Sequence, residues 1–513
     1  MSRARCGTRA HNARAIRGGV LGAGVLALSL WVPVCARAAE PRADDPAVQQ
    51  QLDELREMIR QQNRIIEELR RELDHQKKPA QAEAPKPEER PRTNVPQTVR
   101  KPEASGVQGK PALSTSTGPF QVGYDKGFVI QPVDREKTPF KLRITARMQF
   151  RYTLFARDVR TYTDSAGIIY DINDRSDFEI ERGRLTFDGF AIDPKLGYYL
   201  NLDFDTDDNH DVIAHDFWVY YLFGEAFIAH AGKAFVPGSR EWLMGSTNTR
   251  FADRSLATTF FRPDRSIGIW ALGEPLDGLY YRSMLANGFN TTDLEFNDVD
   301  NNFAWATSAW WDVWDNWGSG WSDLEWHDDP AIQMGTSYTM SQLEGPGPVG
   351  QPSIEQNFVR LSDGTRLTQT GALAPDATVS EFDIYLWSID FATKYKGFGF
   401  NGEYYFRWID DLRANRPLPF TDFFDHGFYI ETGYMIVPKY VEIGARMSRI
   451  FGRFGDRGAE YGGVVNWFIN GTHSWKLTLD ATRVRHSPAQ NTAPGYNIGD
   501  DGVLVRGQLQ AGF

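Results

Sequence analysis

Cysteine is almost absent from the chain, and no long apolar segment occurs beyond its first residues. Its two cysteines, Cys6 and Cys35, both lie within residues 1–38, which excludes a disulfide framework for the rest of the chain. Beyond that segment, no apolar run reaches the roughly 20 residues that a membrane-spanning helix needs. These absences exclude a helical membrane protein but not a transmembrane β-barrel, whose strands are apolar on one face only.

Catalytic and metal-binding motifs are missing as well. The chain has no G-x-S-x-G elbow and no phosphate-binding P-loop. His215 next to Asp216, and His327 next to Asp328 and Asp329, do not repeat at the spacing of a closed metal site. We therefore predict that the protein is not an enzyme and has neither a resident metal nor a cofactor.

Residues 1–38 are typical of a signal peptide. Five arginines and no acid in residues 1–17 precede an apolar stretch, and Ala36-Arg37-Ala38 supplies the small-x-small pattern of a cleavage site. The segment holds six arginines and neither lysine nor acid, so its removal changes the net charge from −11 to −17. Such an acidic mature chain disfavours nucleic acid as a partner.

Two further segments precede the main domain. Residues 39–78 are predicted to form an α-helical coiled coil in the periplasm, because a seam from Val48 to Leu73, apolar except at Gln62, alternates spacings of four and three. A marginal, solvated helix is the alternative that this pattern leaves open. Residues 79–120 are rich in Pro, Lys, Glu and Ala with little to bury, which predicts a disordered or extended linker.

The remaining residues, 121–513, alternate between apolar and polar side chains over long stretches. In residues 142–153 every even position is apolar and every odd position is polar, and the same period of two recurs in 197–205 and 474–484. Strands with one apolar and one polar face, joined in turn by short and long connections, predict an all-β transmembrane barrel of about 16 antiparallel strands.

The connections and the last strand predict how the barrel is oriented. Asp193-Pro194-Lys195 and Val437-Pro438-Lys439 are expected to be tight periplasmic turns, and 206–215, 342–380 and 485–500 outer loops. A last strand that ends at Phe513 is the element that the outer-membrane barrel assembly machinery recognises. We therefore expect the barrel to lie in the outer membrane among its lipids, with the N-terminal segment in the periplasm. A secreted, soluble carbohydrate-binding β protein is an alternative.

The barrel region resembles the phosphate-selective porin O and P family over most of residues 121–513. The strongest match is GKAFVPGSREW (232–242) followed by FADRSLATTFFRPDRSIGIW (251–270), with VRGQLQAGF (505–513) among the later matches. The resemblance implies a homotrimer of 16-stranded barrels whose lumen carries a ladder of basic residues that guides anions such as phosphate.

Nine basic residues are candidates for lining the pore and contacting the solute. The resemblance supplies seven of them and alternation alone supplies two, Arg143 and Arg151. Arginine suits the task because its charged fork matches phosphate oxygens. Each arginine can instead pair with a neighbouring acid such as Asp203, Asp253 or Asp264. The nine candidates are Arg143, Arg147, Arg151, Arg182, Arg184, Lys233, Arg254, Arg262 and Arg265.

Seven tryptophans occur in residues 301–326. We interpret them as part of the aromatic girdles that flank a membrane, and stacking against sugars in a carbohydrate pore is the alternative.

The predicted function is an outer-membrane porin for passive diffusion of small anions, phosphate among them. The alternatives are a nonspecific or sugar-permeable porin, or a barrel that serves mainly as a surface anchor, with the coiled coil contacting peptidoglycan.

Overall fold

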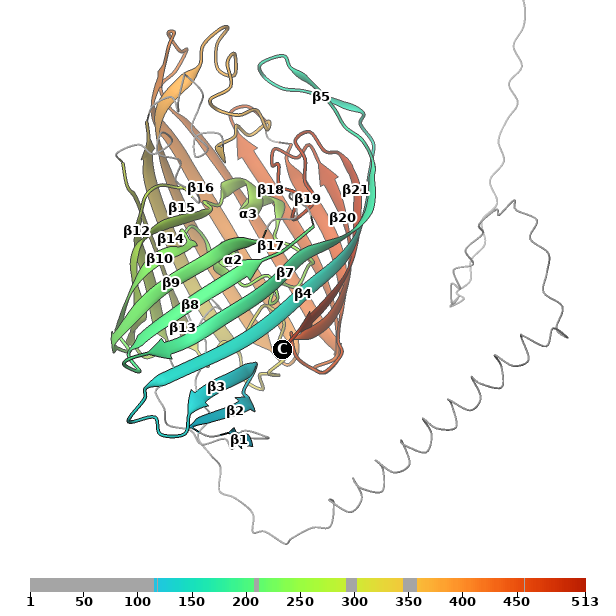
Figure 1. The fold of residues 1–513 in the computed structure, drawn as a ribbon. Coiled ribbons are helices and arrows are strands. Elements are labelled where there is room, and N and C mark those ends of the chain that lie inside the picture. The colour runs from blue at the N-terminus through green and yellow to red at the C-terminus, as the bar shows by residue number, and fades with distance from the viewer. Residues whose placement is uncertain (1–114, 118, 207–211, 292–301, 345–357, 456) are drawn as a thin grey trace, which may run out of the picture. The chain divides into compact units, whose positions relative to one another are not determined.

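Sixteen antiparallel strands close into a barrel in the computed structural model (Figure 1). The structure describes residues 115–117, 119–206, 212–291, 302–344, 358–455 and 457–513. The predicted signal peptide, the coiled coil and most of the predicted linker lie outside these residues.

Each barrel strand pairs with the next one along the chain, and the last strand pairs with the first, from Gly502↔Arg157 to Gly512↔Arg147. This ring confirms the predicted all-β barrel and its strand number. The strands are β4 (Phe140–Arg157), β7 (Arg175–Ala191), β8 (Leu196–Asp203), β9 (Ile213–Gly224), β10 (Phe227–Phe235), β11 (Arg265–Leu276), β12 (Leu279–Ala286), β13 (Ala304–Trp314), β14 (Ala331–Leu343), β15 (Val379–Tyr395), β16 (Phe398–Ala414), β17 (Phe423–Val437), β18 (Val441–Gly452), β19 (Ala459–Phe468), β20 (Trp475–Arg485) and β21 (Gly502–Gly512).

Three short strands extend the sheet at the start of the barrel. These are β1 (Thr115–Thr117), β2 (Phe120–Tyr124) and β3 (Phe128–Pro132), and β3 pairs with β4 from Phe128↔Ile144 to Ile130↔Leu142. Strand β1 and the first residue of β2 therefore belong to the sheet, although the sequence placed them in the linker. A separate hairpin of β5 (Thr161–Thr163) and β6 (Ile169–Asp171) stands in the loop between β4 and β7.

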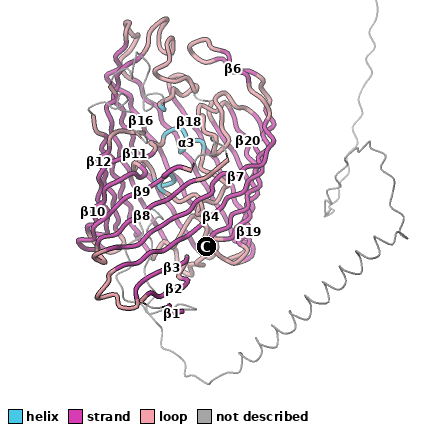
Figure 2. The backbone as a smooth tube through the Cα atoms, in the orientation of Figure 1, coloured by secondary structure: helices cyan, strands magenta, loops and turns pink. Residues whose placement is uncertain are grey.

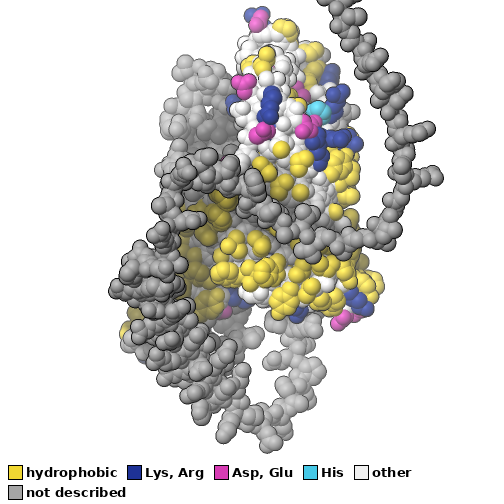
Figure 3. Space-filling model, turned by 90° about the vertical axis from the view of Figure 1, so that its right-hand side faces the viewer, with side chains coloured by type: hydrophobic (Ala, Val, Ile, Leu, Met, Phe, Trp, Pro, Cys, Tyr) yellow, Lys and Arg dark blue, Asp and Glu magenta, His cyan; other side chains and the backbone are white. Residues whose placement is uncertain are grey.

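Side chains alternate across the barrel wall as the sequence predicts. Along β4, Met148, Phe150 and Leu154 are exposed on the outside, while Gln149 and Arg151 are buried inside. Figure 3 shows the result on one face as a zone of apolar side chains in the lower part of the barrel. Among the described residues, no helix is both long enough and apolar enough to span a membrane.

The short turns lie at one end of the barrel, which we call the turn end. The long loops lie at the other end, which we call the loop end. Asp193–Lys195 and Pro438–Lys439 lie in tight turns at the turn end, as predicted, and Phe513 lies at the same end (Figure 1). The predicted C-terminal boundary of the loop 206–215 is wrong, because β9 already begins at Ile213. The other two predicted loops fall between Leu343 and Val379 and between Arg485 and Gly502.

Several connections within the described residues enter the lumen, and in one of them, 486–501, the backbone oxygens of Ala493 and Pro494 accept hydrogen bonds from the inward-facing Arg151 and Arg506. Residues 236–264, the lumenal loop, join β10 to β11 and carry the short helices α2 (Arg240–Leu243) and α3 (Leu256–Phe261), which lie inside the ring of strands (Figure 2). Residues 315–330, the inserted turn, join β13 to β14 at the turn end. Its Trp317 and Trp321 are only 3% and 2% exposed.

The inserted turn corrects the interpretation of the tryptophan-rich segment. Trp305, Trp311 and Trp314 are exposed on the outer face, as a girdle requires. Trp310, Trp317 and Trp321 are instead buried, so the girdle interpretation is wrong for them. The backbone of the inserted turn is held inside the barrel by hydrogen bonds, which removes two of these indoles from the outer surface.

Candidate functional site

The lumenal loop is anchored to one side of the barrel. Ser239 and Ser255 cap the helices α2 and α3 by accepting hydrogen bonds from the backbone N–H groups of Trp242 and Thr258. Helix α3 packs against β16–β18, and its apolar residues belong to a buried cluster that also includes inward-facing residues of β15, β20 and β21. This packing fixes the position of the loop inside the barrel.

Four of the predicted cations converge on the wall formed by β4 and β7–β11. Arg184 lies opposite Arg147 in the strand register, and its guanidinium lies 2.8 Å from His215 Nε2. Beside His215, Lys233 Nζ lies 3.4 Å from the Ala214 backbone oxygen, and Arg265 lies 2.7 Å from Asp216. We call the four side chains of Arg147, Arg184, Lys233 and Arg265 the basic cluster. They come from four different strands and were all candidates from the sequence, so the structure brings together what the resemblance only implied.

Arg147 is the member of the basic cluster with the clearest excess of positive charge. It lies directly opposite Arg184 in the β4–β7 register, and like charges in this position destabilise a sheet. Among the described residues, no carboxylate lies within ion-pair distance of Arg147, whose side chain is half-buried. Arg147 and Arg184 thus form a like-charged pair that faces the lumen.

Two carboxylates moderate the rest of the cluster. The guanidinium of Arg184 lies 2.8 Å from Asp203, and that of Arg265 lies 2.7 Å from Asp216. Two of the four cations in the cluster, Arg184 and Arg265, are thus each paired with an acid. Asp203 is the neutralising partner that the sequence analysis named for a lumenal arginine.

Arg151 and Arg182 serve a different purpose, because both hold Asp253 of the lumenal loop. Their guanidinium groups lie 3.1 Å and 2.8 Å from the Asp253 carboxylate, and Arg151 also pairs with Glu181 at 3.0 Å. Burial alone would raise the pKa of Asp253, but the charges of Arg182 and Arg151 outweigh it and lower that pKa below its ordinary value. These two candidates tether the loop to the wall and have little charge left for a solute.

The three remaining candidates are also engaged. Arg254 donates to the backbone oxygens of Glu241, Trp242 and Met244 and so closes the end of α2. Arg262 lies 2.6 Å from Asp264 and stacks over the Trp242 ring at 4.1 Å.

Arg143 lies on β4, close to the turn end of the barrel. Its guanidinium forms an ion pair with Asp188 at 2.6 Å. Arg143 does not belong to the basic cluster, and its charge is offset by this partner.

Several lumenal cations were missed by the sequence analysis. Arg446, Lys476 and Arg506 occupy inward positions of β18, β20 and β21, and strand alternation would have found them. Arg250 of the lumenal loop and Lys394 of β15 hold backbone oxygens of the inserted turn. No pattern in the sequence signals Arg250, because its partners come from distant strands.

Three side chains of the inserted turn form a compact polar group. One ligand-type atom each from Asp323, Glu325 and His327 lies within 4.8 Å of the others. Protein partners already engage them, since His327 Nδ1 lies 2.5 Å from Asp323 and Glu325 lies 3.5 Å from Lys394. The group fastens the inserted turn and does not revise the prediction of no metal, which stays a prediction.

The contact between His327 and Asp323 predicts a pH-dependent stability. Burial alone would lower the pKa of His327, but its hydrogen bonds to Asp323 and to the Asn316 backbone outweigh it and raise that pKa. The stabilisation is therefore complete below the unfolded pKa of about 6.5 and is lost as the pH rises through the folded value. His327→Gln should cost about 1–3 kcal/mol near pH 5.5 and less at pH 8.5. Thermal unfolding followed by tryptophan fluorescence measures this, and a cost that does not vary with pH would contradict it.

Comparisons with known proteins add likenesses in structure. No family model matches the chain, and no curated protein sequence matches it. The chain is similar to OmpT, an outer membrane protein of Vibrio cholerae, with 10% identity, a TM-score of 0.46 and coverage of 73% of this chain and 98% of that one. It is similar to an anion-selective porin from Comamonas acidovorans with 10% identity, a TM-score of 0.44 and coverage of 73% and 100%. Likenesses at this level bear on neither solute nor assembly, and membership of the phosphate-selective porin family stays a prediction.

Proposed function

We propose that the chain is an outer-membrane porin through which small anions, phosphate among them, diffuse passively. The apolar outer face of a closed barrel supports a membrane location. Long connections gather at one end and short turns at the other, which supports placing the turn end and Phe513 in the periplasm. The homotrimer and the periplasmic coiled coil are further parts of this proposal, and they rest on the resemblance and on the sequence pattern.

The basic cluster is the observation that carries anion selectivity. An anion that enters the lumen must exchange its water shell for charge and hydrogen bonds without being held so tightly that it stalls. Arg147 supplies a half-buried guanidinium with no acidic partner within ion-pair distance among the described residues. Asp203 and Asp216 offset part of the positive charge of their neighbours, which favours release. The geometry therefore suits passage better than tight binding.

The zero-current potential of the refolded protein in a planar bilayer tests this proposal. Under a potassium chloride gradient, we expect a potential of the sign that chloride permeation gives, and we expect added phosphate to reduce the chloride current. Lys233→Gln should lower the selectivity for anions, because it removes one charge of the basic cluster. Arg143→Gln is the matched control, because it removes the same charge near Asp188 and should change the potential less. Cation selectivity, or a current that phosphate does not affect, would refute the anion proposal, and the absence of any current would favour the anchor.

A further inference from the structure

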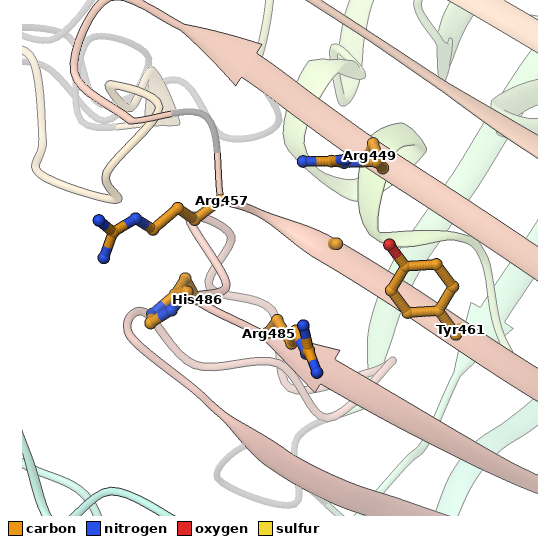
Figure 4. A pocket seen from close by; sticks show the side chains of 6 residues that line it. Arg449, Arg457, Tyr461, Arg485 and His486 are labelled. Atoms are coloured by element: carbon orange, nitrogen blue, oxygen red, sulfur yellow. The ribbon is translucent and has the colours of Figure 1, made fainter.

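Outward-facing basic side chains gather near the loop end of β18–β20. Arg449, Tyr461 and Arg485 lie on outward positions of these three strands, and Arg457 and His486 follow from the adjoining loops (Figure 4). Together with Ala459 they line a recess of about 350 Å³, which we call the rim recess. Of these side chains, His486 lies 3.6 Å from a carboxylate oxygen of Asp501.

The register of the strands explains how the recess forms. Ala459 pairs with Arg449 on one side and with Arg485 on the other. Because neighbouring strands lie about 4.8 Å apart, the two arginine backbones are separated by roughly 10 Å. The small side chain of Ala459 forms the base of the recess between two long basic side chains. Ala459 is only 3% exposed because these two side chains cover it.

Beside the recess, Arg483 lies opposite Tyr461 and is paired with Asp158 and Asp501. The outward surface farther toward the turn end is apolar. Continuing toward the turn end on the outward faces of the same strands, Ile443, Val465 and Leu479 are all exposed. Figure 3 shows basic side chains and a histidine gathered in the upper part of a face whose lower part is apolar. A basic recess and an apolar strip farther along the same strands match a molecule with an anionic head and long hydrocarbon chains.

We propose that the rim recess binds a phosphate group of an anionic outer-leaflet lipid whose acyl chains lie along the strip of Ile443, Val465 and Leu479. Arginine forks bind phosphate oxygens with charge-assisted, often paired hydrogen bonds. Arg485 is exposed, and among the described residues no carboxylate lies within ion-pair distance of it. Tyr461, which is 41% exposed, suits the boundary between headgroup and acyl chains. Free inorganic phosphate has the same oxygen ligands as the lipid headgroup, but it has no apolar part that could contact the apolar strip.

Lipid binding to the refolded full chain in detergent tests the proposal. The probes are lipid A with both of its phosphates and the same lipid after dephosphorylation, and native mass spectrometry counts the bound molecules. We expect the phosphorylated form to bind at least about tenfold more tightly, and we expect Arg449→Gln/Arg485→Gln to abolish this preference. The charge-matched control is Arg366→Gln/Arg413→Gln, two exposed arginines near the loop end but outside the recess, and it should bind as the unmodified chain does.

Three outcomes would overturn the assignment. The double variant could bind both lipids as the unmodified chain does, or the control could lose the preference equally, which would indicate a general effect of charge. Alternatively, the unmodified chain could bind both lipids equally while inorganic phosphate binds in a manner that depends on Arg449 and Arg485, which would make the recess a site for free phosphate. Heat-modifiable migration on a gel confirms that each variant is folded. Channel conductance is a separate readout, so the porin proposal and the lipid proposal can fail independently.

Discussion

Replacing Arg250 by methionine should lower the unfolding free energy by about 3–5 kcal/mol and increase the single-channel conductance. The Arg250 side chain is 0% exposed and lies 2.8 Å from Glu431 and 2.9 Å from Glu442, which are inward residues of β17 and β18. It also donates to the backbone oxygen of Trp321 at 2.8 Å. Without the Arg250 guanidinium, two buried carboxylates lose a positive charge that stabilises them. The hydrogen bond that joins the lumenal loop to the inserted turn is lost as well. We expect both connections to move more freely and the lumen to widen.

Two further variants separate the stability effect from the conductance effect. Arg413→Met removes an exposed arginine that forms surface ion pairs, and it should cost less than about 1 kcal/mol. Arg250→Met with Glu431→Gln and Glu442→Gln removes the buried charges together, so stability should recover while the conductance stays high. Urea unfolding in lipid vesicles and planar-bilayer recordings provide the two readouts. A loss of stability without any change in conductance would show that the packing of α3 alone holds the loop.

Much of the barrel could be predicted from the sequence because its strands face two different environments. Alternation along β4, β8 and β20 is strong, since lipid-facing residues must be apolar while lumen-facing residues can be polar. The start of β9 was missed for a physical reason. A register shift between Asn201 and Leu202 of its partner strand breaks strict alternation, so His215 and Asp216 read as a polar loop.

The candidate site was only partly predictable, because a residue's position says little about its partner. All nine candidates are found in the barrel wall or the lumenal loop, but only four of them make up the basic cluster. Asp253 pairs with Arg151 and Arg182 because the lumenal loop places Asp253 against the barrel wall. Asp253 lies far from both arginines in the sequence. The same limit applies to the tryptophans, whose composition suggests a girdle although the inserted turn buries some of them.

Arg147→Glu should reduce the selectivity for anions strongly while leaving the barrel as stable as before or slightly more stable. The substitution replaces the repulsion between Arg147 and Arg184 by an attraction across the β4–β7 pair, worth about 0.2–1 kcal/mol. The same change removes two units of positive charge from the basic cluster. Each 1.4 kcal/mol or so added to the free energy of an anion at this point lowers its occupancy about tenfold. We therefore expect the ratio of anion to cation permeability to fall by about tenfold or more, measured from the zero-current potential.

Arg147→Gln separates the effect of removing the repulsion between Arg147 and Arg184 from the effect of adding a negative charge. It removes the repulsion without creating an attraction, so both its stability and its selectivity should lie between those of the unmodified chain and of Arg147→Glu. Few structural residues behave in this way, because removing a buried stabilising charge lowers stability and function together. If Arg147→Glu instead destabilises the barrel and leaves the zero-current potential unchanged, Arg147 is a structural residue and the basic cluster does not select the solute. Opposite signs for stability and anion permeability would show that the repulsion between Arg147 and Arg184 is retained for conduction.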